Sequence, residues 1–305
     1  MKPRLSIANI WTRLAQLSGY RGGRMTPKRP YSTMKPPEYY EGRIEGTVNH
    51  YRCYILLHAD EPPSAFPSVF HTPVSRELLA RATKWGGMVN FSWMNTLPSH
   101  SDISSHRRQA ATVFSTLGGR LELPDVLLEN MDKVEARIRL HLEGPVKEST
   151  SDEVHIYVCT HGARDCRCGE RGQRVFEALA EEVESLRRAD PTGPAAKVKV
   201  GEVGHVGGHK YAANALIFPH GEWLGSLKPE DASPIIKLLC DDLQNGDVKP
   251  RGPVEEPSSL RHWRGRMGMT KEEQKHLWES FSLNDSGHKP DPTLNTATLS
   301  PRPRS

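Results

Sequence analysis

The second half of the chain contains a regular series of segments: HIYVCT at residues 155–160, GQRVFEALAEEVESLRR at 172–188, KVKVGEV at 197–203 and NALIFPHGEWL at 214–224. The first and third are short apolar runs typical of buried strands, whereas the second repeats apolar residues at helical spacing. The fourth holds two short apolar runs around Pro219, His220 and Gly221, which predicts a tight hairpin. A last helix is predicted to begin with Ser233 as its N-cap and Pro234 in its first turn.

The predicted order is strand, helix, strand, hairpin and helix. This is the order of a thioredoxin-like domain, in which helices cover a small sheet. We expect this α/β domain over residues 150–246. Upstream, an apolar run at 51–58, helical spacing over 74–85 and a second run at 88–94 predict a smaller α/β lobe over residues 45–145. Near its end, apolar and polar residues alternate from Val134 to Leu142, which favours a half-buried strand, although propensities permit a helix. No internal repeat is evident.

Downstream of this domain the composition changes. Residues 247–262 contain Pro250, Pro253 and Pro257, and this composition is typical of a linker. Residues 263–282 comprise the segment WRGRMG and a short helix, whose start is predicted from the capping box formed by Thr270 and Glu273. Residues 283–305 are rich in polar residues and proline without apolar periodicity, which predicts a disordered tail.

The first 37 residues differ from the rest in charge, because they contain eight Lys or Arg residues and no Asp or Glu. With apolar residues at helical spacing over 7–17, this composition predicts a mitochondrial transit peptide. The stretch RPYS at 29–32 resembles a matrix-processing site and would start the mature chain near Ser32. A disordered basic tail is the alternative.

The charge and cysteine content exclude several classes of protein. Without the leader the chain has a formal charge of −4, which disfavours a nucleic-acid-binding surface over the fold. The longest apolar runs fall far short of the roughly 18 residues that span a bilayer, so no transmembrane segment is predicted. Five unevenly spaced cysteines do not suggest a secreted disulfide framework.

Two loops that follow successive strands of the second domain carry the reactive side chains. One loop runs from Cys159 to Gly169 and contains Cys168, and the other runs from Gly204 to Asn214 and contains His205 and His209. Loops at one edge of a sheet converge, so the thiols of one can meet the imidazoles of the other. A pair of histidines satisfied within the core is the alternative, but the facing thiols favour metal ligation. The sequence therefore predicts a site with four ligands: Cys159, Cys168, His205 and His209.

The strings C-x-H-G-x-R-D-x-x-C-G at 159–169 and G-H-x-G-G-H-K-Y-A-x-N at 204–214 resemble the signatures of the sucrase/ferredoxin-like family. This family comprises thioredoxin-like ferredoxins, among them the fungal altered-inheritance-of-mitochondria proteins. The resemblance is strong over residues 154–245, weaker over 50–145, and extends to 263–268. It implies a 2Fe-2S cluster held by Cys159, Cys168, His205 and His209, with Cys166 outside the ligand set.

Simple charge counting is consistent with that implication. Two ferric ions, two sulfides and two thiolates sum to zero, and reduction by one electron gives −1, whereas four thiolates would give −2 and −3. Replacing two Cys by two His therefore favours electron uptake, as in Rieske centres. Nearby basic side chains would favour the reduced form, steer an acidic partner, or only form a solvated face; these are Arg164, Arg167, Arg171 and Lys210.

The leading hypothesis is a mitochondrial 2Fe-2S protein of the matrix or intermembrane space that acts in electron transfer or redox homeostasis with an unknown redox protein partner. On this hypothesis we expect a redox protein rather than a hydrolase or transferase. Two thiolates and two imidazoles would equally suit a structural zinc site. A thiol-disulfide oxidoreductase using Cys166 and Cys168 is a third option, although no C-x-x-C is present. The fourth is a non-catalytic quality-control or assembly factor that binds a partner through 263–268 and the following helix.

Overall fold

The computed structural model describes residues 38–94, 108–144 and 152–285. The described residues from Tyr39 onward belong to one compact unit. The predicted transit peptide and its processing site, and the tail from residue 286 onward, lie outside the described residues. None of the helices in the described ranges is long and apolar enough to cross a membrane.

The first half of the fold is built around a four-stranded sheet. Strand β1 pairs in parallel with β2, β3 pairs antiparallel with β1, and β4 pairs antiparallel with β3. Helix α1 begins after Thr72, whose hydroxyl accepts a hydrogen bond from the Ser75 amide and so satisfies a free donor of the first turn. The elements are β1 (Cys53–His58), α1 (Pro73–Ala82), β2 (Gly87–Trp93), β3 (Arg108–Ser115), β4 (Gly119–Leu127) and α2 (Met131–Glu143).

The second half confirms the predicted thioredoxin-like arrangement. Strand β5 pairs in parallel with β6, and β7 and β8 follow as an antiparallel hairpin beside β5. All six residues of β5 are buried, as expected for a central strand covered on both faces. The elements are β5 (Val154–Cys159), α3 (Gln173–Ala189), β6 (Val198–Val203), β7 (Ala215–Phe218), β8 (Glu222–Leu224), α4 (Ala232–Asn245), β9 (Trp263–Arg266) and α5 (Lys271–Asp285).

The two halves share one topology, which the sequence did not reveal as a repeat. The nine strands lie in the order β4-β3-β1-β2-β6-β5-β7-β8-β9, so each half has the same strand order running outward from the β2–β6 junction. At that junction Ser92 pairs with Val203 in antiparallel fashion. The registers also correspond: Tyr54 of β1 faces Phe114 of β3, as His155 of β5 faces Phe218 of β7.

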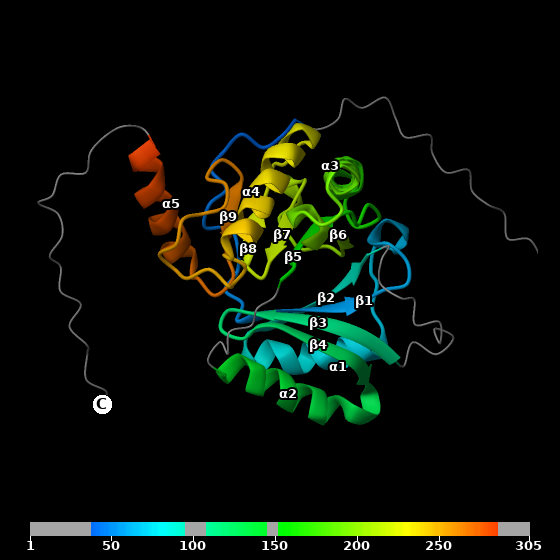
Figure 1. The fold of residues 1–305 in the computed structure, drawn as a ribbon. Helices are drawn as coiled ribbons and strands as arrows, with labels where there is room; N and C mark the ends of the chain where they lie inside the picture. Colours follow the sequence, from blue (N-terminus) through cyan, green and yellow to red (C-terminus); the bar gives the residue numbers. More distant parts are fainter. Residues whose placement is uncertain (1–37, 95–107, 145–151, 286–305) are drawn as a thin grey trace, which may run out of the picture. The chain divides into compact units, whose positions relative to one another are not determined.

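Helices cover the outer face of each half of the nine-stranded sheet, and the inner faces of the two halves pack on one another. Figure 1 shows α1 and α2 along the β1–β4 sheet, with α3 and α4 on the far side of the β5–β8 sheet. Between these two inner faces, the rings of Phe114 and Phe218 stack with their centroids 4.3 Å apart. Tyr54 and Tyr157 are buried in the same cluster as these two rings. Aromatic packing therefore joins the two halves.

The segment 134–142 forms part of helix α2, so the prediction of a strand there was wrong. Val134, Ile138 and Leu142 are buried and lie four residues apart, whereas Leu140 is 73% exposed. The apolar residues at even positions gave an apparent period of two, but only those one helical turn apart face the core. Helix α4 also begins two residues earlier than predicted, at Ala232, with Asp231 rather than Ser233 at the N-cap.

The C-terminal segment from Trp263 onward adds a strand to the edge of the sheet. Strand β9, which the sequence did not predict, pairs antiparallel with β8, and its four residues are all buried. The predicted capping box of α5 is confirmed: the Thr270 hydroxyl accepts from the Glu273 amide at 3.2 Å, and the Glu273 carboxylate accepts from the Thr270 amide at 2.7 Å.

Candidate metal centre

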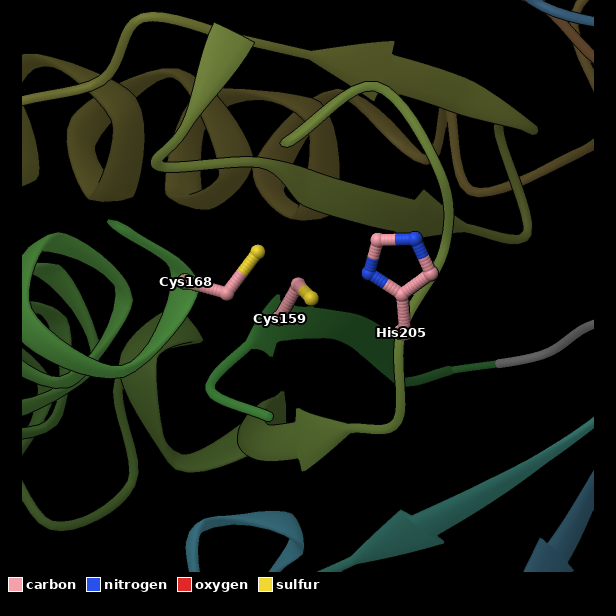
Figure 2. A group of neighbouring side chains, drawn as sticks. All are labelled: Cys159, Cys168 and His205. Atoms are coloured by element: carbon pink, nitrogen blue, oxygen red, sulfur yellow. The ribbon is translucent and has the colours of Figure 1, made fainter. Parts of the chain in front are cut away.

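Three of the four predicted ligands lie together at one edge of the second half. Cys159 is the last residue of β5, Cys168 opens the helical turn that leads into α3, and His205 follows β6. Their ligand atoms all lie within 4.8 Å of one another. Figure 2 shows the two thiols and the imidazole projecting into one space from three separate segments. Both thiols are fully buried, and neither is in a disulfide.

Glycines allow the turn that carries Cys168 to approach the end of β5. A Cβ atom at Gly172 would lie 2.0 Å from the carbonyl oxygen of Cys159. A Cβ atom at Gly169 would lie 2.7 Å from the Cα atom of Gly162. No real side chain tolerates such distances, so these positions require glycine. Gly169 and Gly172 therefore allow the two cysteines to come together.

The two thiols have pKa values shifted in opposite directions. The pKa of Cys159 lies well below its ordinary value, because its thiolate accepts hydrogen bonds from Cys168 and His205 and from the Val206 amide. The pKa of Cys168 is raised, because its proton is held by the Cys159 sulfur and because burial disfavours a second negative charge. A bound metal would supply the positive charge that lets both thiols ionise, as metal ligation requires.

His205 has a ring nitrogen suited to a metal. Its Nδ1 atom is buried and has no hydrogen-bond partner among the described residues. The side-chain amide of Asn90 donates to the carbonyl oxygens of Gly204 and His205 at 3.3 and 3.4 Å, which fixes the backbone of this loop. A buried imidazole nitrogen without a partner is costly in a protein interior. Beside two thiols, it has the chemistry of a metal ligand.

His209 lies next to this group but is not a member of it. Its ring centroid is 5.7 Å from that of His205, its side chain is 48% exposed, and its Nδ1 lies 3.8 Å from a carboxylate oxygen of Asp165. Between the histidines, Gly207 and Gly208 adopt φ values of +84° and +69°. These left-handed conformations favour glycine and fold the loop back on itself.

The remaining cysteines lie elsewhere. Cys166 is exposed and does not belong to the group of three. Cys53 is buried in β1, where burial raises its pKa to about 12. Cys240 is buried in α4 and packs in the core beneath α3 and α4.

The basic side chains noted in the sequence have different surroundings. Arg167 makes a hydrogen-bonded pair with Asp165 at 2.9 Å, which lowers the pKa of that carboxyl. Arg171 is buried, and its guanidinium lies 4.1 Å from the ring centroid of Tyr39. Lys210 lies over the ring of Tyr211. Only part of the predicted basic face is therefore open to solvent.

Sequence reasoning missed residues that reach the centre from the first half. The His161 ring nitrogen Nε2 donates to the carbonyl oxygen of Pro67 at 2.8 Å, which ties the cysteine loop to a loop between β1 and α1. A hollow of about 220 Å³ lies between these loops and reaches His205. Its walls include Phe66, Phe70, Phe91, His161 and Arg164. His161 and Arg164 belong to the cysteine motif, but no local pattern marks Phe66, Phe70 and Phe91, because their proximity to the centre arises only from the packing of the two halves.

Comparison with known proteins places these features in a family. The sequence model of the sucrase/ferredoxin-like family matches residues 44–252, which is more than half of the chain. The chain is 31% identical over 147 residues to altered inheritance of mitochondria protein 32 of Meyerozyma guilliermondii, covering 46% of the chain and 49% of that protein. It is 31% identical over 156 residues to actin patches distal protein 1 of Saccharomyces cerevisiae, covering 49% of the chain and 44% of that protein. The matched region thus spans about half the length of these relatives.

Among solved structures, the chain is similar to a thioredoxin-like [2Fe-2S] ferredoxin from Aquifex aeolicus. The likeness covers 37% of the chain and 98% of the ferredoxin, with 21% identity and a TM-score of 0.28.

Proposed function

The chain belongs to the sucrase/ferredoxin-like family, and from this premise we propose that it is a redox protein carrying a 2Fe-2S cluster on Cys159, Cys168, His205 and His209. The observation that carries the proposal is the grouping of two buried thiols and the His205 imidazole, whose ligand atoms lie within 4.8 Å of one another. When bound, the cluster would supply reversible one-electron chemistry. The residues of this chain hold it, exclude water from it and set its potential.

The donor set supports iron and sulfide on these residues. Thiolates are the usual ligands of such clusters, and imidazole replaces thiolate on one iron in Rieske centres. Cys159 and Cys168 would hold one iron from the buried side. His205 and the half-exposed His209 would hold the other iron. Cys166 would remain free.

The histidine side of the centre is where electrons would enter and leave. His205 borders the hollow lined by Phe66 and Phe70, and His209 is half exposed, whereas both cysteines are buried. A redox partner would therefore approach the imidazoles. The exposed Arg164 at the rim of the hollow would attract an acidic partner surface.

We also propose a mitochondrial location. The Arg-rich, acid-free leader has the composition of a transit peptide, and a matched relative is named for altered inheritance of mitochondria. Mass spectrometry of the organellar protein is expected to find a chain that begins near Ser32. A protein with Met1 intact would contradict processing.

Anaerobic purification of the full chain tests the cluster. The protein is expected to be coloured and to contain two irons and two acid-labile sulfides per chain. Reduction by one electron should bleach the visible bands and produce a paramagnetic signal. A colourless protein with one zinc per chain would contradict the proposal and favour the structural zinc site.

A further inference from the structure

The WRGRMG segment, which lies beyond residues 44–252 that the family model matches, sends one side chain to the loop that carries the candidate ligands His205 and His209. Strand β9 places Arg264 beside β8, and this residue is only 2% exposed. Its side chain runs toward the loop that carries His205 and His209. The segment therefore contributes to the centre as well as to the sheet.

The guanidinium of Arg264 connects three parts of the fold. Its Nη1 donates to the Asn214 side-chain oxygen at 2.9 Å and to the Gly207 carbonyl at 3.4 Å. Its Nε donates to the Thr47 hydroxyl at 3.1 Å. The Asn214 carbonyl accepts from the Cys159 amide at 3.0 Å, so the network continues to the end of β5. One side chain thus positions the histidine loop against a cysteine.

Two glycines make room for this side chain. A Cβ atom at Gly208 would lie 2.4 Å from Nη2 of Arg264, and a Cβ atom at Gly225 would lie 2.6 Å from its Cδ. Gly208 also has a positive φ, so its place in the histidine loop requires glycine on two grounds. The loop is shaped to accept the arginine.

Arg264 brings a buried positive charge that has no carboxylate partner among the described residues. All its hydrogen-bond acceptors there are neutral oxygens. Burial lowers its pKa to about 10, so it stays charged at neutral pH, and the groups that favour its charge are Tyr211, Cys159 and Cys168. The rings of Tyr211 and Trp223, with centroids 4.8 and 5.5 Å from its Cζ atom, stabilise the cation in part. Because no carboxylate balances this buried charge, an anion nearby would stabilise it further.

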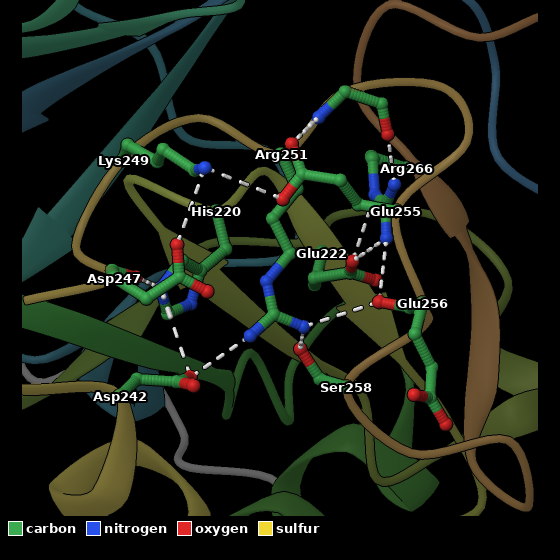
Figure 3. Close-up of polar contacts among 11 residues, drawn as sticks. His220, Glu222, Asp242, Asp247, Lys249, Arg251, Glu255, Glu256, Ser258 and Arg266 are labelled. Atoms are coloured by element: carbon green, nitrogen blue, oxygen red, sulfur yellow. Dashed lines mark hydrogen bonds and ion pairs between the residues drawn. The ribbon is translucent and has the colours of Figure 1, made fainter. Parts of the chain in front are cut away.

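Arg266 on the same strand provides the contrast. Its Nε donates to a carboxylate oxygen of the buried Glu222 at 2.8 Å, and the carboxylate neutralises its charge. Figure 3 shows this pair within a polar network that also contains His220, Asp242 and Arg251. The two arginines are both buried, but only Arg266 is balanced by a side chain.

We propose that Arg264 is a positioning residue that supplies a fixed positive charge to the metal centre and thereby raises its midpoint potential. This inference rests on the proposed function. With two thiolates and two neutral imidazoles, the oxidised centre carries no net charge and the reduced centre carries −1. A buried cation stabilises only the charged, reduced form, so it favours electron uptake.

The test is a spectroelectrochemical titration of full-length variants purified anaerobically. Arg264→Gln removes the charge, Arg264→Lys keeps it, and the isosteric Asn214→Asp neutralises it with a carboxylate. The double variant Glu222→Gln with Arg266→Gln is the control, since it removes a balanced pair of charges. In the cluster-free proteins, hydrogen exchange over 204–214 measures how firmly the loop is held.

At a fixed potential, Arg264→Gln and Asn214→Asp are expected to lower the ratio of reduced to oxidised centre at least tenfold, equivalent to 59 mV for one electron. Arg264→Lys and the control should stay within threefold of the wild type. Loop exchange should accelerate at least tenfold in Arg264→Gln, with or without a cluster.

Three results would overturn the inference. The first is an unchanged potential in a cluster-bearing Arg264→Gln, and the second is an Arg264→Lys shift as large as that of Arg264→Gln. The third is loss of the cluster from both neutralised variants, which would make the residue necessary for assembly rather than for potential. A wild type without any cluster would instead contradict the proposed function.

Discussion

Cysteine environment separates the candidate ligands from the other thiols. Cys159 and Cys168 are buried against each other, whereas Cys166, only two residues before Cys168, is exposed. Sequence proximity to a ligand therefore does not bring a thiol into the centre. The turn that opens α3 directs Cys168 inward and leaves Cys166 at the surface.

We predict that Cys159→Ser or Cys168→Ser abolishes cluster binding, because a serine oxygen is a poor substitute for a thiolate on iron. Cys166→Ser and Cys240→Ser should retain it and serve as matched controls. Iron and sulfide analysis with visible absorption provides the measurement. Bleaching by Cys166→Ser alone would show that the ligand assignment is wrong.

His220 is a buried residue of the turn between β7 and β8. Burial and the nearby Arg251 lower its pKa from 6.5 to about 4. Its Nε2 donates to the Asp247 carbonyl at 3.1 Å and lies 3.8 Å from the Asp242 carboxylate of α4. The folded state therefore holds this imidazole neutral, whereas the unfolded chain protonates it near pH 6.5.

Because the folded pKa is lower, the unfolded state binds more protons between pH 6.5 and 4. The stability that this residue contributes is present above pH 6.5 and is lost as the pH falls toward 4, by up to about 3 kcal/mol. Urea unfolding of the wild type and His220→Asn at pH 7.5 and 4.5 measures the difference. An equal loss of stability in both proteins would contradict the assignment.

At the scale of elements, the approach of the helical turn to β5 depends on Gly172. We predict that Gly172→Ala destabilises the fold by about 3 kcal/mol, because the added methyl group meets the Cys159 carbonyl, and that it lowers the yield of metal-bound protein. Gly144→Ala is the control. Its added methyl group lies 3.5 Å from the nearest atom in extended backbone, so it should change stability by less than about 0.5 kcal/mol.

Chemical denaturation and metal analysis of both variants decide this prediction. If Gly172→Ala were as stable and as metal-rich as the control, the close approach of the two segments would not be required for the centre.

The sequence predicted elements best where one face alone is apolar. Helix α3 buries Val175, Leu179 and Val183 and was predicted nearly to the residue. Helix α2 was mistaken for a strand, because Ala136 and Leu140 mimic alternation while facing away from the core. Strand β9 was missed because its residues Arg264 and Arg266 are charged, and their burial depends on partners distant in sequence.

At the metal centre, too, the residues predicted from the sequence are those placed there by the order of strands and loops. Cys159 ends β5, Cys168 lies in the segment that follows it, and His205 follows the neighbouring strand β6, so topology alone predicted their convergence. The contributions of Asn90 and Arg264 depend on contacts across 115 and 50 residues of sequence. A local pattern does not indicate such contacts, and they became evident only from the fold.

At the scale of the whole molecule, we expect the two halves to unfold together, because their inner faces form one shared core. We predict that Phe114→Ala, in the half without the metal centre, lowers the stability of the whole described fold by about 3 kcal/mol or more, because the ring stacks on Phe218. Leu140→Ala, which alters an exposed residue of the same half, is the control.

Circular dichroism and the absorption of the cluster, followed together in denaturant, test the coupling. Both signals should be lost in a single transition that shifts to lower denaturant in Phe114→Ala. Loss of secondary structure from one half while the centre persisted would show that the halves fold independently.

Pulsed EPR of the reduced protein, with its histidines labelled with ¹⁵N, tests the central claim most directly. The two-thiolate, two-imidazole centre predicts strong couplings to two directly bound nitrogens, both of which change on ¹⁵N-histidine labelling. His209→Cys should leave a cluster with one such coupling, whereas Cys166→Ser should leave both. A paramagnetic cluster without histidine nitrogen coupling would contradict ligation by His205 and His209.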